Sequence, residues 1–259
     1  MIKLYEHPLS PYAQKVKLAL YEKGLPFTAE VPDIFGGTSS EFVASNPRQE
    51  VPSLIDGEVH VFDSTVILEY LEDKWPQPAM LPATAQDRAR VRMLEDLCDT
   101  YFEAINWALA EIRVFGRAKG EQAEQLVARA GKQIGGMYQR LERELGARTW
   151  FNGERFGWGD LSVWPYVTGS VGQGFPPSSG SRLAGWLERA NQRDSTVQCM
   201  TAAAAALAGF QNLEAIVEQG LFKREYRDHR LEWMMRSGGV QIVLDGMAKG
   251  NIRFAHELT

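Results

Sequence analysis

The first strand-to-helix junction limits the fold of this chain more than any other feature. Residues 2–5 are a short apolar run that predicts a strand, and residues 13–23 repeat apolar side chains at helical spacing. We expect the lysines of that helix on its outside. Ser10 can cap the helix and Pro11 fits its first turn. A hydroxyl at a helix N-terminus is also well placed to hold a thiolate, although such a start by itself usually indicates only a cap.

Two further motifs follow this junction later in the chain. After a further expected strand and helix, Val51-Pro52 stands at the start of a short strand, and the turn at Asp56-Gly57 leads into another strand over residues 59–62. Asp63-Ser64 then precedes a helical run over residues 65–72. The chain therefore has three motifs, each at the boundary between a strand and the segment beside it.

In this order and at this spacing the motifs resemble the glutathione transferase superfamily. The resemblance covers residues 1 to about 80 well and the remainder in its general layout. It implies a thioredoxin-like N-terminal domain. No convincing strand pattern follows that domain, so we expect an all-α C-terminal domain and an α+β chain.

The proline-rich segment at residues 75–82 breaks the helical pattern on both sides and predicts the domain boundary. We expect a first domain at 1–76, a linker at 77–82, a helical domain at 83–222 and a helical extension at 223–259. Thr84 with Asp87 predicts a cap for a helix whose apolar spacing continues to Ile112. The other expected helices are a long one near 121–145, a short one after residue 157, and those at 183–193 and 195–219.

Composition narrows the functional class. The 259 residues carry a net charge of −5, which does not suggest a nucleic-acid partner. No apolar stretch has the length of a membrane span, and we expect a cytoplasmic protein. The two cysteines, Cys98 and Cys199, fall in expected helices and form no disulfide framework. The four histidines lack metal-ligand spacing, so we expect no metal site.

The resemblance implies that glutathione lies extended along the first domain as a co-substrate. Asp63 and Ser64 would hold its γ-glutamyl end, with the carboxylate on the ammonium group and the helix start on the α-carboxylate. The same two residues could also simply cap the helix, and the two roles are compatible. Val51-Pro52 would contain a cis proline beside the cysteinyl part of glutathione, or else an ordinary proline at a strand start.

The resemblance also implies a residue that activates the thiol. Ser10 matches the catalytic serine, which donates a hydrogen bond to the sulfur, whereas Tyr5 is the competing candidate near the end of the first strand. Serine at this position argues against thiol–disulfide chemistry, which needs a protein thiolate. Tyr12 would flank the bound molecules or pack in the core.

Glu50 departs from the family pattern, in which lysine or glutamine often precedes Val-Pro. A glutamate repels a carboxylate but accepts a hydrogen bond from an amide. Arg48 is the nearby residue that could offset its charge.

The electrophile pocket of such proteins lies between the domains. Tyr101, Trp107 and Arg113 lie in the corresponding helix and are candidates for its lining. Asp160 resembles the reciprocal residue of the family's N-capping box, with Gly157 where serine or threonine is usual.

We therefore expect a homodimeric detoxification enzyme that conjugates the thiolate of glutathione to small hydrophobic electrophiles. Two alternatives remain open. One is a glutathione lyase or ether-cleaving variant of the same chemistry. The other is a non-catalytic glutathione-fold protein that binds ligands or partners, for which Glu50 is the main support.

Overall fold

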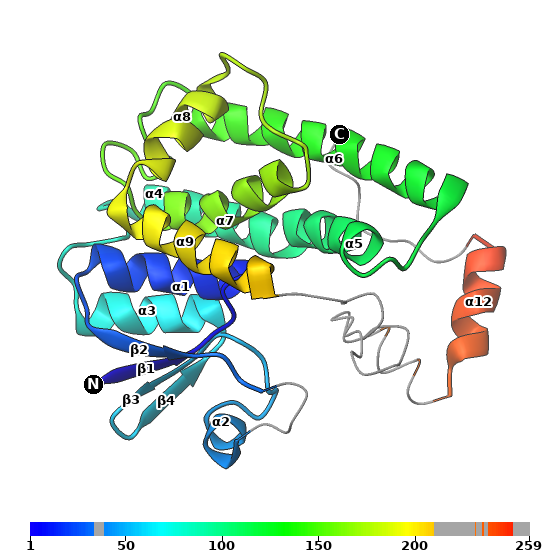
Figure 1. The fold of residues 1–259 in the computed structure, drawn as a ribbon. Coiled ribbons are helices and arrows are strands. Elements are labelled where there is room, and N and C mark those ends of the chain that lie inside the picture. The colour runs from blue at the N-terminus through cyan, green and yellow to red at the C-terminus, as the bar shows by residue number, and fades with distance from the viewer. Residues whose placement is uncertain (34–38, 210–230, 232–234, 236–237, 251–259) are drawn as a thin grey trace.

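The structure is a computed structural model that describes residues 1–33, 39–209, 231, 235 and 238–250 (Figure 1). The N-terminal part of the chain forms a four-stranded mixed sheet. Its strands are β1 (Ile2–Tyr5), β2 (Phe27–Glu30), β3 (Ser53–Asp56) and β4 (Val59–Phe62), in the order β2-β1-β3-β4. β1 runs parallel to β2 and antiparallel to β3, and β3 pairs antiparallel with β4. The order and directions confirm the predicted thioredoxin-like arrangement.

The two faces of the sheet are covered by different helices. α1 (Pro11–Glu22) and α3 (Ser64–Lys74) lie on one face, and α2 (Ser40–Ser45) lies beyond the other (Figure 1). The alternation of β1 follows from this layering. Ile2 and Leu4 enter the main core with α1 and α3, whereas the ring of Tyr5 packs on Phe42 of α2, with 5.0 Å between ring centroids.

In the described residues of the second domain the regular elements are all helices, as predicted, and one isolated bridge pairs Trp150 with Gly153. Its helices are α4 (Ala85–Leu97), α5 (Glu103–Arg113), α6 (Gly120–Leu145), α7 (Trp158–Gly172), α8 (Arg182–Asn191) and α9 (Asp194–Gly209), and a separate α12 (Val240–Ala248) follows. One π-helical turn, η1 (Cys98–Phe102), joins α4 to α5. The single long helix expected from Thr84 to Ile112 is therefore continuous but contains a local change of winding.

The predicted caps are present. Thr84 Oγ1 accepts a hydrogen bond from Asp87 N at 3.1 Å, and Asp160 Oδ2 accepts one from Gly157 N at 3.1 Å. The expected continuation of α9 to residue 219 and most of the extension at 223–259 lie outside the described residues. In the portion that is described, no helix combines the length and the apolar character needed to cross a membrane.

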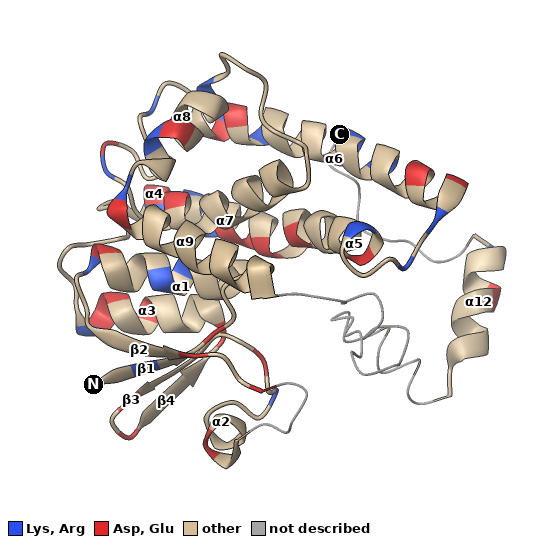
Figure 2. Cartoon of the chain, viewed as in Figure 1, with Lys and Arg blue, Asp and Glu red and all other residues tan. Residues whose placement is uncertain are grey.

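The expectation that the lysines of α1 face outward is wrong. Lys15 is fully buried, Lys17 is 3% exposed and Lys23 is 8% exposed. The reason is that α1 is enclosed on several sides. It packs on α3 of the first domain and on α7 and α9 of the helical domain. Figure 2 shows basic positions on α1, which lies between the sheet and the helical domain. The ammonium group of Lys17 pairs with Glu6 at 2.8 Å, and that of Lys23 pairs with Glu72 at 2.8 Å.

The connection between the domains is held by Glu72 at the C-terminal end of α3. Its carboxylate accepts hydrogen bonds from Met80 N and Leu81 N at 3.0–3.1 Å. Met80 O in turn accepts one from Trp158 N at 2.8 Å, at the start of α7. The linker is thus fastened to both domains.

Candidate active site

Strand register brings the three sequence motifs to one end of the sheet. Tyr5 of β1 pairs with Ser53 of β3, and Ser53 pairs with Phe62 of β4, so these three residues form one row across the sheet. The chain leaves this row toward Ser10 after β1, arrives at it through Val51-Pro52 before β3, and leaves it through Asp63-Ser64 after β4. Segments far apart in sequence therefore meet at a common edge.

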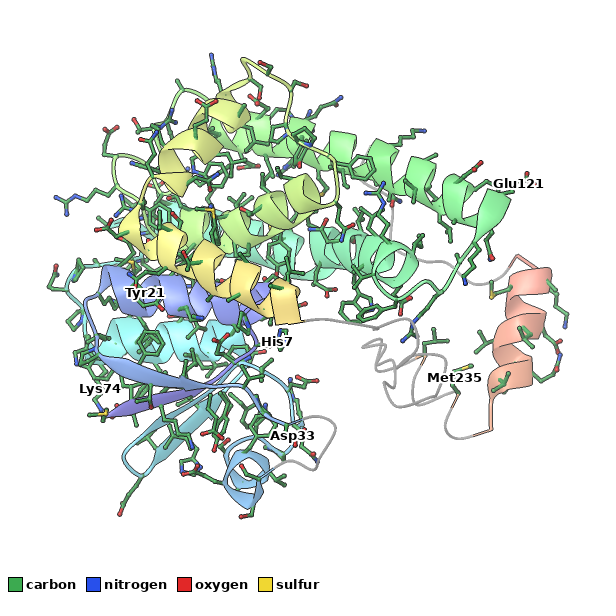
Figure 3. The ribbon with its side chains drawn as sticks, viewed as in Figure 1. His7, Tyr21, Asp33, Lys74, Glu121 and Met235 are labelled. Atoms are coloured by element: carbon green, nitrogen blue, oxygen red, sulfur yellow. The ribbon has the colours of Figure 1, made fainter. Side chains whose placement is uncertain are left out.

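Ser10 is the N-cap of α1, and its Oγ accepts a hydrogen bond from Ala13 N at 3.3 Å. The hydroxyl hydrogen is left available for donation to a ligand. A short turn holds Ser10 in place, because Ser10 N donates to His7 O at 2.8 Å and Leu9 N donates to His7 Nδ1 at 3.3 Å. Figure 3 labels His7 between the sheet and the start of α1. Burial lowers the pKa of His7, which favours the neutral ring that this turn requires.

The Val51-Pro52 bond is cis, as the resemblance implied. Pro52 is buried and Val51 is half-buried. The preceding loop is fixed by Asn46, whose Nδ2 donates to Glu50 O at 2.7 Å. The guanidinium of Arg48 lies 4.0 Å from the carboxylate of Glu50, so the expected compensating charge is nearby.

Asp63 and Ser64 form the start of α3. Asp63 Oδ1 accepts hydrogen bonds from Thr65 N at 3.0 Å and Val66 N at 3.2 Å, and the residue is exposed. Its backbone has φ 73°, a left-handed conformation that is uncommon for a side chain other than glycine and that occurs often at binding sites. Ser64 is 5% exposed at the first helical position. Capping is thus established, and the positive end of the helix dipole faces the same edge.

Tyr5 lies in the common row but points to the opposite face from α1. Its hydroxyl donates to Glu41 Oε2 at 2.5 Å and accepts from Lys3 Nζ at 2.8 Å, and the side chain is 1% exposed. Between the two candidates for thiol activation, this geometry favours Ser10.

Tyr12 joins the two domains. Its hydroxyl donates to Asp99 O at 2.8 Å, and its ring lies edge-on to Tyr166 with 6.4 Å between centroids. The structure therefore gives Tyr12 a packing contact with η1 and α7.

The three pocket candidates are spread along one helical stretch. Tyr101 in η1 is 37% exposed, and Trp107 in α5 is half-buried against Phe115. The indole Nε1 of Trp107 is buried without a hydrogen-bond partner. Arg113 donates to Gln173 O and lies over the ring of Phe175 at 5.2 Å. The backbone positions of Tyr101 and Arg113 are about 18 Å apart along this helical stretch.

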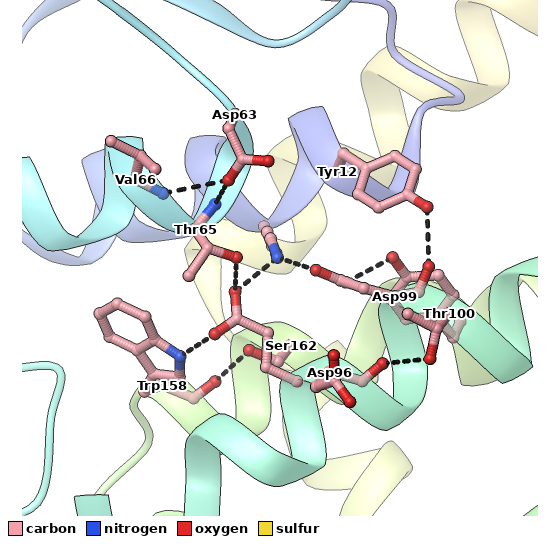
Figure 4. A network of polar contacts seen from close by, with 12 residues as sticks. Tyr12, Asp63, Thr65, Val66, Asp96, Asp99, Thr100, Trp158 and Ser162 are labelled. Atoms are coloured by element: carbon pink, nitrogen blue, oxygen red, sulfur yellow. Dashed lines mark hydrogen bonds and ion pairs between the residues drawn. The ribbon is translucent and has the colours of Figure 1, made fainter. Parts of the chain in front are cut away.

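The sequence did not reveal the buried charge cluster beneath this site, which consists of Lys15, Glu95 and Asp99 (Figure 4). Lys15 Nζ donates to Glu95 Oε1 and to Asp99 Oδ2, both at 2.5 Å. Burial would lower the pKa of Lys15, but the charges of Asp99 and Glu95 outweigh it and raise that pKa. Burial raises the pKa of Asp99, an effect that Lys15 partly offsets.

The cluster and its hydrogen-bond partners lie in five secondary-structure elements, α1, α3, α4, η1 and α7. Glu95 Oε1 also accepts from Thr65 Oγ1 at 2.8 Å, and Glu95 Oε2 accepts from Trp158 Nε1 at 2.5 Å. Asp99 Oδ1 accepts from Tyr166 OH at 2.7 Å. The only sequence signal was the i, i+4 spacing of the two acidic residues, which is common on exposed helices and did not single them out.

The arrangement suits an extended anionic ligand with a nucleophilic atom. The starts of two helices, α1 and α3, face one edge of the sheet, and the positive end of a helix dipole favours an anionic group. Among the described residues, no cluster of histidine, cysteine and acidic side chains could hold a metal ion.

Comparison with protein families gives two matches. The family model for the glutathione S-transferase N-terminal domain matches residues 4–79, and that for the C-terminal domain matches residues 124–189. Glutathione S-transferase U28 of Arabidopsis thaliana is 30% identical over 193 residues, which cover 72% of this chain and 82% of that protein. A stringent starvation protein A homologue of Histophilus somni is 25% identical, covering 76% of this chain and 89% of that protein.

Solved structures share the fold. Rice GST1 in complex with glutathione superposes with a TM-score of 0.67 at 29% identity, covering 80% of this chain and 95% of that chain. A glutathione S-transferase from Rhodospirillum rubrum superposes with a TM-score of 0.69 at 26% identity, covering 78% and 92%.

Proposed function

This chain belongs to the glutathione S-transferase superfamily, and on that premise we propose that it conjugates the thiolate of glutathione to small hydrophobic electrophiles. The observation that carries the proposal is the row of Tyr5, Ser53 and Phe62, from which Ser10, Val51-Pro52 and Asp63-Ser64 all emerge at one edge. A tripeptide lying along this edge would meet all three motifs. The rice relative was solved with glutathione, which supports glutathione as the ligand.

Ser10 is the proposed catalytic residue. A free thiol titrates near pH 8.5, and lowering its pKa by about two units requires about 2.7 kcal/mol of preferential thiolate stabilisation. A hydrogen bond from a hydroxyl to an anion supplies about 1.5–3 kcal/mol and a helix N-terminus about 0.3–1 kcal/mol. Ser10 and the start of α1 together are therefore sufficient.

The proposed reaction has two steps. The thiol of glutathione loses its proton to solvent, and the thiolate then attacks the electrophilic carbon. A new S–C bond forms, and either a leaving group departs with its electron pair or the attacked double bond or ring takes up a proton. A lyase or ether-cleaving enzyme would use the same thiolate on a substrate with a different leaving group.

Disulfide exchange is not supported by the cysteines of this chain. Cys98 and Cys199 are both buried, and burial raises the pKa of each thiol, that of Cys199 to about 12. A buried thiol of high pKa is a poor nucleophile. Conjugation through the thiolate of the ligand is the chemistry that fits.

The ultraviolet absorbance band of bound glutathione thiolate tests this function directly. We expect the wild type to bind thiolate at neutral pH, Ser10→Ala to bind glutathione mainly as the thiol, and Ser10→Thr to retain part of the band. Conjugation of aryl halides, epoxides and unsaturated carbonyls would then identify the electrophile class.

The same absorbance measurement separates the alternative functions. Glutathione binding without a thiolate band in the wild type would favour a non-catalytic binding protein, the reading to which Glu50 lends support. A melting temperature that glutathione does not raise would contradict binding as well. The homodimer that the family suggests is part of the proposal, and sedimentation velocity of the full chain tests it.

A further inference from the structure

We propose that Tyr12 and Thr65 are positioning residues, which hold the starts of α1 and α3 at the separation that one bound glutathione requires. This inference rests on the proposed function and deepens it. Neither residue needs to touch the reacting sulfur. Each acts through the buried charge cluster on the helix start next to it.

Tyr12 lies two residues after Ser10, in the first turn of α1. Its hydroxyl donates to Asp99 O at 2.8 Å, so the first turn of α1 is bonded to η1 in the helical domain. Because Ser10 caps the same turn, a displacement of Tyr12 moves the hydroxyl that would meet the sulfur.

Thr65 has the equivalent place in α3. It directly follows Ser64, and its Oγ1 donates to Glu95 Oε1 at 2.8 Å, while its backbone N–H donates to Asp63 Oδ1 at 3.0 Å. The residue next to the proposed γ-glutamyl-binding pair is therefore hydrogen-bonded to α4.

Lys15 connects the two attachments. Glu95 and Asp99 lie one helical turn apart, and Lys15 Nζ bonds to both carboxylates at 2.5 Å. All four carboxylate oxygens have partners, because Trp158 and Tyr166 occupy the remaining two. A buried network in which every carboxylate oxygen is bonded holds its side chains in one geometry. The path from Tyr12 to Thr65 is thus a rigid bridge between the two helix starts (Figure 4).

Separation matters here because an extended ligand must reach both helix starts at once. A loosened bridge lets the Ser10 turn and the Asp63-Ser64 turn move independently. Each end can still bind its own part of glutathione, but the two ends no longer do so simultaneously in the productive geometry. The expected defect is therefore in glutathione affinity and thiol pKa rather than in folding alone.

The test compares Tyr12→Phe and Thr65→Val, which delete one hydroxyl each and keep the side-chain shape. Tyr138→Phe is the matched control, since Tyr138 OH also donates to a main-chain carbonyl, Phe175 O, at 2.6 Å. Thr65→Ser keeps the hydroxyl and should therefore not show the defect expected of Thr65→Val. The measurements are the KM for glutathione, kcat, the pKa of the bound thiol and the melting temperature, all on the full chain.

We expect the KM for glutathione to rise about two- to tenfold in Tyr12→Phe and in Thr65→Val, the effect of losing one hydrogen bond. The thiol pKa should rise in both, and the double variant should show less than the product of the two single effects, because the bridge is already open after the first change. Thr65→Ser should stay near wild type, and so should Tyr138→Phe.

Two outcomes overturn the inference, and they can be told apart. If the wild type binds glutathione as thiolate but Tyr12→Phe and Thr65→Val match Tyr138→Phe in KM and thiol pKa, the positioning role is wrong and the proposed function stands. If the wild type binds no glutathione, the proposed function fails and this inference fails with it.

Discussion

Asp160 Oδ1 accepts a hydrogen bond from the indole Nε1 of Trp186 at 2.8 Å, deep in the helical domain. The same carboxylate also accepts from the backbone N–H groups of Phe151, Asn152 and Gly157 at 2.8–3.2 Å. Asp160 therefore ties α8 and the loop before α7 to the first turn of α7. Burial raises its pKa from 3.8 to about 6, although the four donors oppose that shift.

The first prediction concerns pH. Because the folded pKa of Asp160 lies above the unfolded value, the stability that this group contributes is present in full below about pH 4 and is lost as pH rises through about 6, by about 3 kcal/mol. Asp160→Asn lacks this titration. The difference in free energy of unfolding between wild type and variant should fall from pH 4 to pH 7 in denaturant titrations. A difference that grows with pH would show that the four donors prevail over burial.

The second prediction concerns Gly157, where the family usually has serine or threonine. Despite the favourable capping character of serine, Gly157→Ser should lower the free energy of unfolding by about 1–3 kcal/mol, because a Cβ here would overlap Met80 O and the amide of Asn152. Gly135→Ala in α6 is the control. No atom lies within 4 Å of its added Cβ, and alanine should raise stability by about 0.5–1 kcal/mol. Stabilisation by Gly157→Ser would contradict the close approach of the linker.

Glu50 gives the third prediction. Removing its charge in Glu50→Gln should lower the KM for glutathione about two- to fivefold, the effect of a partly exposed charge near an anionic ligand. The gain should shrink as salt is added. Glu58→Gln changes the same charge in the turn between β3 and β4, at the other end of the sheet, and should leave the KM unchanged. An increase in KM with Glu50→Gln would mean that the carboxylate accepts a hydrogen bond from the ligand.

The fourth prediction concerns the buried charge cluster. Lys15→Met leaves Glu95 and Asp99 buried and unpaired, so the free energy of unfolding should fall by about 3–5 kcal/mol. Lys74→Met is the comparison, because Lys74 pairs with Asp56 at the surface with its side chain 44% exposed, and such a pair contributes about 1 kcal/mol or less. Adding Glu95→Gln and Asp99→Asn to Lys15→Met should recover part of the loss. Equal effects of the two lysine substitutions would contradict strong desolvation of Lys15.

The sequence predicts local structure here better than it predicts what packs around it. Capping by Ser10, Thr84 and Asp160 depends on neighbouring residues in the chain, so short-range patterns were sufficient. The thioredoxin-like first domain followed from the family resemblance, and the helical second domain from the absence of a strand pattern after the first domain. The π-helical turn at Asp99 was invisible, because apolar spacing stays close to helical through a single wide turn.

The lysines of α1 show why the remaining features were missed. A charged residue in an amphipathic pattern ordinarily faces solvent, and only the partners on distant segments make burial of Lys15 favourable. Those partners lie about 80 residues away, at Glu95 and Asp99. No local pattern reports such a pairing. The same applies to Tyr12, whose carbonyl partner belongs to the other domain.

Enclosure of α1 also limits how the two domains can vary. Lys15 belongs to the first domain and both of its carboxylate partners to the second, so neither domain alone is electrically balanced at the surface where they meet. A segment of residues 1–80 expressed alone would expose this cation together with the apolar side chains around it. Recombining either domain with its counterpart from a relative would succeed only if the acidic pair and the lysine were transferred together. Whether exchanged domains fold together therefore depends more on matched charges across the domain boundary than on the position at which the linker is cut.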